Sequence, residues 1–335
     1  MTWFERLMGF REQSPEQVRS LLELSGEELV SLHNGKCYRC GTLEVVSLDE
    51  LAGRSSPGMS VSRKSTIQEV VADVKELHID AKNAGSLFQV ASQFNLLEMV
   101  GPEITPEMGV GIYENDRTQG PACAMACGAG TIYRNYLVPI GSQTGQTESL
   151  QINCLEDFEK ALGEFSPISW HYKNGYILPD AINLKQICDY LRGCSESELR
   201  ELRGLVRIGI QWDTQVTLAE SKHCVSQAYC SALPVAYGNQ PAVAWEAFAR
   251  LVLEAAYEAT FHAAVLNRLR NGKSTVFLTL LGGGAFGNNT QWILESLGRG
   301  FDLFRDAGLD VRVVSYGRSN PQLVKFLRQT GEEIT

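Results

Sequence analysis

The feature that most constrains the fold is an unbroken apolar run, TVFLTLL at residues 275–281, that leads directly into the glycine-rich segment GGGAFGNN at residues 282–289. A run of this length without alternating polar residues is typical of an interior parallel strand that is covered on both faces. An amphipathic stretch follows, with Ile293, Leu297 and Phe301 on one helical face. The segment therefore predicts a buried strand, a tight turn and a helix, which is the repeating unit of an α/β protein.

The remaining pattern extends this prediction along the chain. Alternating apolar residues at 206–212 indicate a half-buried strand. Further strands are expected at 228–235 and 311–316, and a helix is expected over 245–259. Near the start, residues 17–24 favour a helix, and an extended stretch follows at 37–48. We therefore expect a central mixed sheet flanked by helices.

The chain of 335 residues is long for one minimal domain. The segment GRSSPGMS at residues 53–60 is the best linker candidate, so we expect an N-terminal extension over 1–60 and a main α/β domain over 61–335. Residues 150–203 carry three helical stretches and few reactive side chains. They are expected to form a helical insertion in the main domain.

Composition excludes several classes of function. The formal net charge of −9 argues against non-specific binding of nucleic acid, which usually requires a basic face. No stretch approaches the roughly 20 apolar residues that span a bilayer, and Sec-type secretion is not expected, since residues 1–17 show neither a basic leader nor an apolar signal segment. Nine scattered cysteines suggest reduced thiols. We expect a cytoplasmic protein without a membrane partner, metal or cofactor, although export by a route that reads other signals stays open.

The glycine-rich segment has chemical as well as steric meaning. Glycines let backbone N–H groups approach a ligand, and the following helix directs its positive end to the same place, which favours an anion such as a diphosphate. No Lys-Ser/Thr pair follows the glycines, so this is not a Walker loop, and the spacing is not that of a Rossmann fingerprint. Phe286 between the glycines offers a stacking surface. The alternative is a strand–helix turn that needs glycine only for steric reasons.

Three segments in one order carry a resemblance to a known family. Ala72-Asp73-Val74 looks like the macrodomain GD(I/V) signature, QVASQFN at residues 89–95 resembles the strand that ends in N-A-A-N, and GPACAMACGAG at residues 120–130 lies where the first glycine-rich loop and its helix should be. The segment GGGAFGNN then resembles the second phosphate-binding loop. The likeness spans about residues 70–318, and the shared order is its main support.

The resemblance implies how ADP-ribose would bind. Asp73 would hold the adenine amino group, and Asn95 with Phe286 would face the distal ribose. The diphosphate would lie between the two glycine-rich loops. The implied ligand-binding residues are Asp73, Asn95, Gln119, Gly120, Gly282, Gly283, Gly284, Ala285, Phe286, Gly287 and Asn288.

The motifs QFNLLEM, DRTQGPACA, RNY and WDTQV make the chain similar to a divergent macrodomain branch that includes arginine-ADP-ribose hydrolases of bacterial effector type. The resemblance implies a hydrolase that removes mono-ADP-ribose from proteins, with ADP-ribose and an ADP-ribosylated protein as partners. The paired glutamates of poly-ADP-ribose glycohydrolases are missing, which argues against that activity.

Three carboxylates are candidates for hydrolysis of the N-glycosidic bond, because a carboxylate stabilises an oxocarbenium-like state or orients water. Asp213 ends a predicted strand, at the edge where α/β ligand sites form, and is the first choice. Asp116 precedes the first glycine-rich loop, and Glu98 is the third candidate. The alternative for each aspartate is an Asx-turn or a helix cap.

Two other functions stay open from the sequence. A non-catalytic reader of ADP-ribosylated proteins would need the same binding loops, and only the carboxylates favour hydrolysis. An enzyme on another nucleotide sugar or an NAD-like ligand is the second alternative. Cys123 and Cys127 are expected to be small packing residues rather than nucleophiles, since no histidine is near them in sequence. The CxxC pair Cys37 and Cys40 has no second pair to complete a zinc site.

Overall fold

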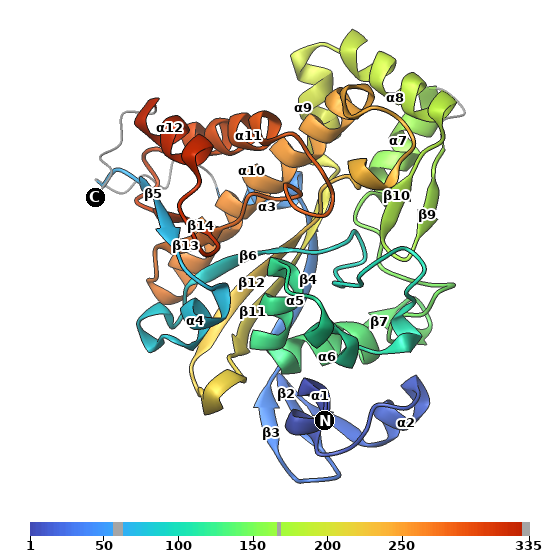
Figure 1. The fold of residues 1–335 in the computed structure, drawn as a ribbon, viewed down its shortest axis with the longest axis vertical. Helices are drawn as coiled ribbons and strands as arrows, with labels where there is room; N and C mark the ends of the chain where they lie inside the picture. Colours follow the sequence, from blue (N-terminus) through green and yellow to red (C-terminus); the bar gives the residue numbers. More distant parts are fainter. Residues whose placement is uncertain (56–62, 166–168, 330–335) are drawn as a thin grey trace.

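A seven-stranded mixed sheet forms the centre of the computed structural model, which describes residues 1–55, 63–165 and 169–329 (Figure 1). In spatial order its strands are β4 (Thr42–Ser47), β11 (Arg207–Gln215), β12 (Cys224–Cys230), β6 (Leu87–Ala91), β13 (Thr275–Leu278), β14 (Asp310–Ser315) and β5 (Thr66–Val71). From β12 to β5 all neighbouring strands pair in parallel. Strand β11 runs antiparallel to both of its neighbours.

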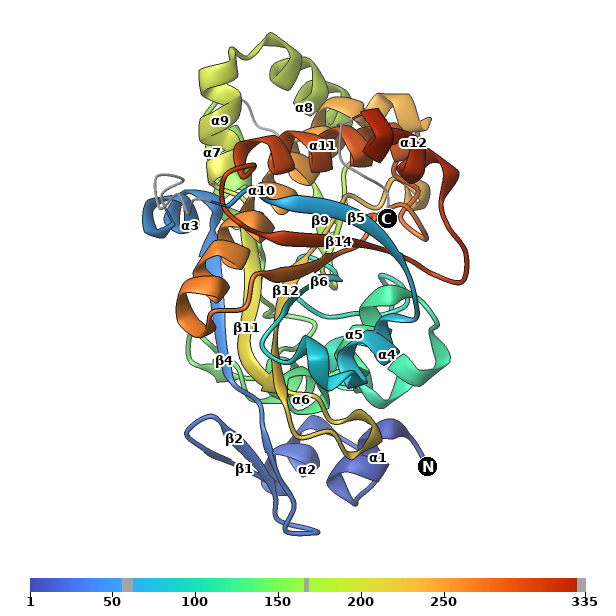
Figure 2. The same ribbon diagram turned by 90° about the vertical axis from the view of Figure 1, so that its left-hand side faces the viewer.

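Helices cover both faces of this sheet (Figure 2). One face carries α3 (Leu48–Arg54), α10 (Glu246–Asn271), α11 (Thr290–Leu303) and α12 (Pro321–Gln329), and the other carries α4 (Val74–Ile79), α5 (Gln119–Ala126) and α6 (Gly128–Tyr136). Between the layers, the ring of Phe88 stacks on that of Phe277, with centroids 4.5 Å apart. The predicted α/β class, a mixed sheet flanked by helices, is confirmed.

The predicted strands are present, with shifted bounds. The apolar run expected to extend to residue 281 forms a strand only as far as Leu278, because the chain then turns toward the glycines. Similarly, the strand expected at 228–235 begins earlier, at Cys224, and ends at Cys230. The helix expected over 245–259 is longer and reaches Asn271.

The expected insertion is mainly helical. It comprises α7 (Glu156–Phe165), the hairpin of β9 (His171–Lys173) and β10 (Tyr176–Leu178), α8 (Ala181–Gly193) and α9 (Glu196–Gly204). A short hairpin of β7 (Pro139–Ile140) and β8 (Gln143–Thr144) precedes it. In Figure 1 the insertion lies at one end of the molecule. Tyr176, at the start of β10, lines the cavity that is described below.

We call residues 1–41 the N-terminal segment. It contains α1 (Trp3–Met8), α2 (Pro15–Ser20) and a three-stranded sheet of β1 (Leu22–Ser25), β2 (Glu28–Ser31) and β3 (Cys37–Arg39). The helix expected over 17–24 ends at Ser20, because the following residues pair with β2. This segment shares a second hydrophobic core with α5 and α6.

The division of the chain near residue 60 stays a prediction. Residues 42–54, which lie before that boundary, form β4 and α3 and so take part in the central sheet and its helical layer. The linker candidate at 53–60 falls largely on residues 56–60, which lie outside the described residues.

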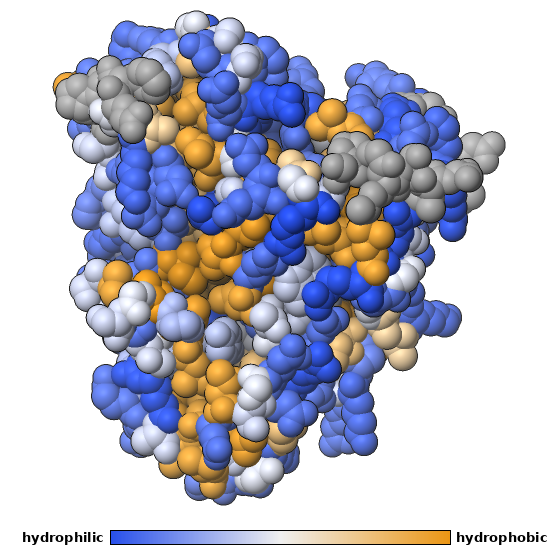
Figure 3. All heavy atoms as spheres, turned by 180° about the vertical axis from the view of Figure 1, so that it is seen from behind, coloured by the Kyte–Doolittle hydropathy of each residue, from blue (hydrophilic) through white to orange (hydrophobic). Residues whose placement is uncertain are grey.

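Hydrophobic residues on the rear surface gather in a central area and in a strip below it, between hydrophilic regions (Figure 3). No helix within the described residues is long and apolar enough to cross a membrane.

The stacked aromatic pair in the sheet is expected to be a main source of stability. Replacing Phe88, which is fully buried, with alanine should lower the free energy of unfolding by about 3–5 kcal/mol through the lost burial and the remaining cavity. Urea denaturation measures the change. The control Leu303→Ala removes an exposed side chain and should stay within about 0.5 kcal/mol of the parent. Equal effects of the two substitutions would contradict this packing.

Candidate functional site

A cavity of about 870 Å³ lies at the carboxyl ends of the parallel strands. Residues that follow β5, β6, β12, β13 and β14 all line it, among them Ala72, Ser92, Ala232, Thr279 and Tyr316. Parallel strands end at one edge of a sheet, so their loops meet there, and this is where open α/β folds bind ligands. The position of the cavity thus follows from the strand directions.

The glycine-rich segment after β13 forms one wall of the cavity. Its residues Gly282, Gly284, Ala285 and Phe286 line the cavity. A Cβ atom on Gly284 would meet no neighbour within 4 Å, so the backbone there is open to a ligand. The predicted close approach of a ligand to this loop therefore has the space that it requires.

Other residues of the same loop face the protein and hold its shape. Gly282 has a φ of +73°, which favours glycine. The amide of Asn288 donates hydrogen bonds to the carbonyl oxygens of Leu233, at 2.8 Å, and Gly282, at 3.3 Å. Gly283, Gly287 and Asn288, which were expected to contact the ligand, do not line the cavity.

The start of α5 also lines the cavity. A Cβ atom on Gly120 would overlap the carbonyl oxygen of Ala91, so glycine is needed for α5 to pack on the end of β6. The side chain of Gln119 accepts a hydrogen bond from Ala91 N at 2.9 Å and donates one to Gln89 O at 2.8 Å. Both residues line the cavity, and the positive end of α5 faces it.

The rest of the segment expected as the first glycine-rich loop is helical. Residues 120–130 fall within α5 and α6. A Cβ atom on Gly128 would lie 2.7 Å from the indole of Trp3, and one on Gly130 would lie 2.8 Å from Thr214 Oγ1. These glycines therefore allow protein elements to approach each other, and they do not contact the cavity.

Of the three residues expected at the ends of the ligand, Asp73 and Phe286 line the cavity and Asn95 does not. It is the N-cap of α4 and accepts a hydrogen bond from Lys75 N at 2.8 Å. Asn95 is buried, and its side chain bonds to Gln151 and to Leu97 N. The structure therefore does not place Asn95 at the cavity, where the contact with the distal ribose was expected. From the same loop, Gln93 lines the cavity instead.

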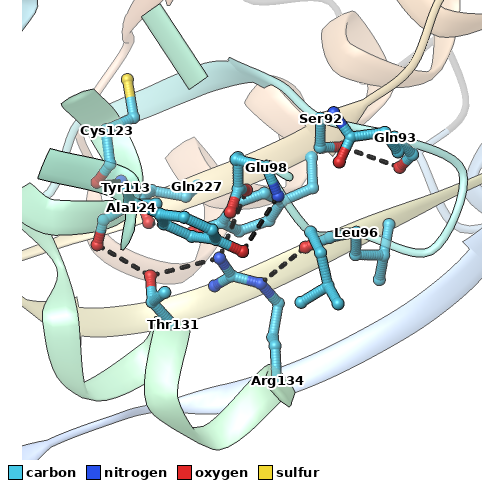
Figure 4. A network of polar contacts seen from close by, with 12 residues as sticks. Ser92, Gln93, Leu96, Glu98, Tyr113, Cys123, Ala124, Thr131, Arg134 and Gln227 are labelled. Carbon is cyan, nitrogen blue, oxygen red and sulfur yellow. Dashed lines mark hydrogen bonds and ion pairs between the residues drawn. The ribbon is translucent and has the colours of Figure 1, made fainter. Parts of the chain in front are cut away.

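Glu98 lines the floor of the cavity and lies in a buried polar network (Figure 4). Arg134 extends from α6 toward Glu98, with a distance of 3.4 Å between its Nη2 atom and Glu98 Oε1. The guanidinium also donates to Leu96 O and Thr131 Oγ1, and it stacks on the ring of Tyr229 at 3.6 Å. The hydroxyl of Tyr113 accepts a hydrogen bond from Glu98 N at 3.1 Å. Glu98 Oε2 has no hydrogen-bond partner among the described residues.

Burial dominates the electrostatics of Glu98. The loss of hydration raises the pKa of its carboxyl to about 8, against the smaller opposing effects of Arg134 and Tyr113. The side chain is therefore largely protonated at neutral pH and can donate a proton. A carboxylic acid with a raised pKa at the floor of a cavity is typical of a general acid.

Asp116 lines the cavity near its mouth, beside an aromatic cluster that we define as Tyr176, Tyr237 and Phe286. The three ring centroids are 5.3–5.8 Å apart. Burial, Tyr237 and then the Asp116 carboxylate raise the pKa of Tyr176, so the charge of Asp116 reaches this cluster. Asp116 Oδ1 also accepts a hydrogen bond from Thr118 N at 2.7 Å, which is the Asx-turn that was the alternative to a catalytic role.

Asp213, the first choice of catalytic residue, lies away from the cavity and apart from the other two candidate carboxylates. Because β11 is antiparallel to β12, its last residues lie opposite the start of β12, with Thr214 facing Val225. Asp213 is in an irregularity of that pairing, with a φ of +53°, and its carboxylate pairs with Arg270 at 2.7 Å. A strand end marks the ligand edge only when the strand runs in the parallel direction.

Sequence reasoning missed the partners of Glu98 and two of the aromatic residues. Arg134 in the motif RNY is fully buried on α6, and a lone arginine on a helix with apolar neighbours was the available signal. Tyr113 in YENDRTQGP is three residues from Asp116, so its nearness to the site was also readable. Tyr176 comes from the insertion and gave no local signal.

No histidine or cysteine among the described residues lines the cavity. His78 is buried and stacks on Phe88. Burial raises the pKa of Cys123 well above its usual range, so this thiol is a poor nucleophile. Within residues 1–55, 63–165 and 169–329, no group of three His, Cys, Asp or Glu side chains could hold a metal ion.

Comparisons with known proteins found structural similarity only. No protein-family model matches the chain, and no curated protein matches it. It is similar to the structure of poly(ADP-ribose) glycohydrolase from Thermomonospora curvata bound to the inhibitor ADP-HPD, with a TM-score of 0.45 and 12% identity over 94% of this chain and 95% of the other. It is also similar to poly(ADP-ribose) glycohydrolase from Deinococcus radiodurans in complex with ADP-ribose, with a TM-score of 0.43 and 10% identity over 86% and 93% of the two chains. At these values the similarity assigns no role to any residue of this chain.

The raised pKa of Glu98 predicts a pH dependence of stability. A carboxyl whose pKa is higher in the folded chain contributes stability that is complete below its unfolded pKa and is lost as pH rises through about 8. The parent should therefore become less stable relative to Glu98→Gln between pH 6 and pH 9, as measured by urea denaturation at each pH. A constant difference between the two proteins across this range would show that Glu98 does not titrate there.

Proposed function

We propose that this protein is an ADP-ribosylhydrolase that removes mono-ADP-ribose from protein side chains. The observation that carries the proposal is the convergence of separate segments on one cavity. Asp73, Glu98, Asp116, the start of α5 and the loop at Gly284 are far apart in the chain, yet all line it. The sequence resemblance to macrodomains relates most of these segments to ADP-ribose.

The groups that line the cavity support ADP-ribose as the ligand. The carboxylate of Asp73 can accept the adenine amino group at one end. The positive end of α5 and the open backbone at Gly284 both line the cavity, and backbone amides there can hold the diphosphate. The aromatic cluster offers a stacking surface to the distal ribose.

Glu98 and Asp116 supply two carboxyl groups with different surroundings for the bond to be broken. Glu98 is buried and protonated near neutral pH, so it can give a proton to the leaving nitrogen as the N-glycosidic bond breaks. Asp116 is partly exposed and can stabilise the oxocarbenium-like state and orient the water that attacks the anomeric carbon. The attacking water forms the new C–O bond and releases one proton, which restores Glu98.

We propose arginine as the modified side chain. A guanidinium group favours carboxylates and the faces of aromatic rings. Both are present at the cavity mouth, where Asp116 and Glu114 lie with Tyr237, which is one-third exposed.

The binding assignment predicts the effect of a substitution at Gly284. Valine there would project into the cavity and should raise the Kd for ADP-ribose by about a hundredfold or more, as measured by calorimetry. Gly193→Val is the matched control, because Gly193 lies outside the cavity, has open space around it and should leave the Kd unchanged. Unchanged affinity in Gly284→Val would remove this loop from the phosphate site.

The catalytic assignment predicts that turnover and binding separate. Glu98→Gln and Asp116→Asn should lower kcat for release of ADP-ribose from an arginine-modified protein by about 10²-fold or more, while the Kd for ADP-ribose stays within about tenfold. Asp213→Asn is the control, since Asp213 lies at the other edge of the sheet, and it should keep the parent rate. Glutamate- and serine-linked substrates measured beside the arginine-linked one test the linkage. A parent protein that binds ADP-ribose but releases none from any linkage would identify a reader instead.

A further inference from the structure

The N-terminal segment contacts both elements that hold Glu98. Tyr113, which accepts the hydrogen bond of Glu98 N, lies in the 3₁₀ turn η3 (Gly111–Asn115). Arg134, which pairs with the Glu98 carboxyl, lies on α6. Both η3 and α6 contact the carboxylate of Glu12, which lies between α1 and α2 of the N-terminal segment.

The carboxylate of Glu12 makes three hydrogen bonds across this junction. Its Oε1 accepts from Val110 N at 2.9 Å, and its Oε2 accepts from Gly111 N at 2.7 Å, so it binds the start of η3. The hydroxyl of Tyr136, on the same helix as Arg134, donates to Oε1 at 2.5 Å. One side chain thus ties η3 to α6.

The chain around Glu12 is shaped for this contact. Gly109 has a φ of +87°, and a Cβ atom there would lie 2.5 Å from the Glu12 carboxyl carbon. A Cβ atom on Gly111 would lie 2.8 Å from Glu12 Oε2. Two glycines therefore leave room for the carboxylate to reach the backbone amides.

The surrounding core extends the connection to Glu98 itself. Leu97 and Met99, the two chain neighbours of Glu98, are buried in the core that contains Trp3, Phe4 and other residues of the N-terminal segment. Trp3 also donates from its indole to Val110 O at 2.9 Å and from its backbone to Glu114 at 2.9 Å. The contacts of this segment with η3 are therefore polar as well as apolar.

We infer that Glu12 is a positioning residue, which sets the placement of Glu98 by fixing η3 and α6 relative to each other. The expected effect on kcat rests on the proposed function. The expected effect on the placement of Glu98 rests on the geometry alone. Glu12 does not line the cavity, so it acts through Tyr113 and Arg134 rather than on the ligand.

The test compares variants that remove hydrogen bonds of Glu12 with one variant that only weakens the same hydrophobic core. Glu12→Ala removes all three hydrogen bonds, and Tyr136→Phe removes one of them with little change of shape, so at least one folded variant is available. Leu29→Ala removes a fully buried side chain from the same core and leaves these bonds in place. Folding of each variant is checked by urea denaturation.

Glu12→Ala and Tyr136→Phe should lower kcat by about tenfold or more, while the Kd for ADP-ribose stays within about threefold. Leu29→Ala should keep the parent kcat even where it costs stability. In a Glu98→Gln background the Glu12 substitution should have no further effect on the residual rate, because its action passes through Glu98. An unchanged kcat, or an equal loss in both backgrounds, would overturn the inference.

Hydrogen exchange of the Glu98 amide supplies a second readout that does not depend on turnover. Glu12→Ala should speed this exchange by about tenfold or more, because the acceptor Tyr113 is no longer held, and Leu29→Ala should not. An inactive parent with this pattern would contradict the proposed function and leave the inference standing. Equal exchange in the parent and Glu12→Ala would overturn the inference whatever the activity.

Discussion

The direction of the strands is the constraint on which the rest of the structure depends. The five adjacent strands from β12 to β5 run in parallel, so their carboxyl ends lie at one edge of the sheet. The five segments that follow these strands meet there and line the cavity. The close packing of α5 on the end of β6, which requires glycine at position 120, then brings the start of a helix to the same edge. Once the sheet is formed, the binding groups have little freedom to lie anywhere else.

Local patterns predicted much of the fold, because buried strands and helices show runs or regular spacings of apolar residues in the sequence. The run at 275–281 and the alternation at 206–212 mark β13 and β11, and the helices that follow or precede them were readable from their apolar faces. The direction of β11 was not readable. It depends on pairing with β4, which is far away in sequence, as well as with β12, which follows after a short connection, and it places Asp213 away from the cavity.

Cavity-lining residues were predictable where they belong to a short sequence motif. They were not predictable where a turn of the backbone decides which side chains face the cavity. Asp73, Asp116, Gln119, Gly120 and four residues of the glycine loop line the cavity as expected. Between Asn95 and Glu98 the backbone turns through Leu96, which has a φ of +65° and packs over Gly209 of β11. That turn directs Asn95 into the protein and Glu98 to the cavity floor, and no periodicity in QFNLLEM indicates it.

The pairing of a protonated acid with a buried guanidinium has a thermodynamic consequence for ligand capture. An arginine side chain keeps its charge in proteins, so when Glu98 is neutral the charge of Arg134 has no counter-ion beside it and is shared with the ring of Tyr229. In a poorly hydrated interior that charge is weakly screened. Arg134 lies behind Glu98 and does not line the cavity, so its charge would act on a bound ligand mainly through Glu98. Under the proposed function, the negative charge of a bound diphosphate would disfavour ionisation of Glu98, so binding of the anion and retention of that proton would be linked.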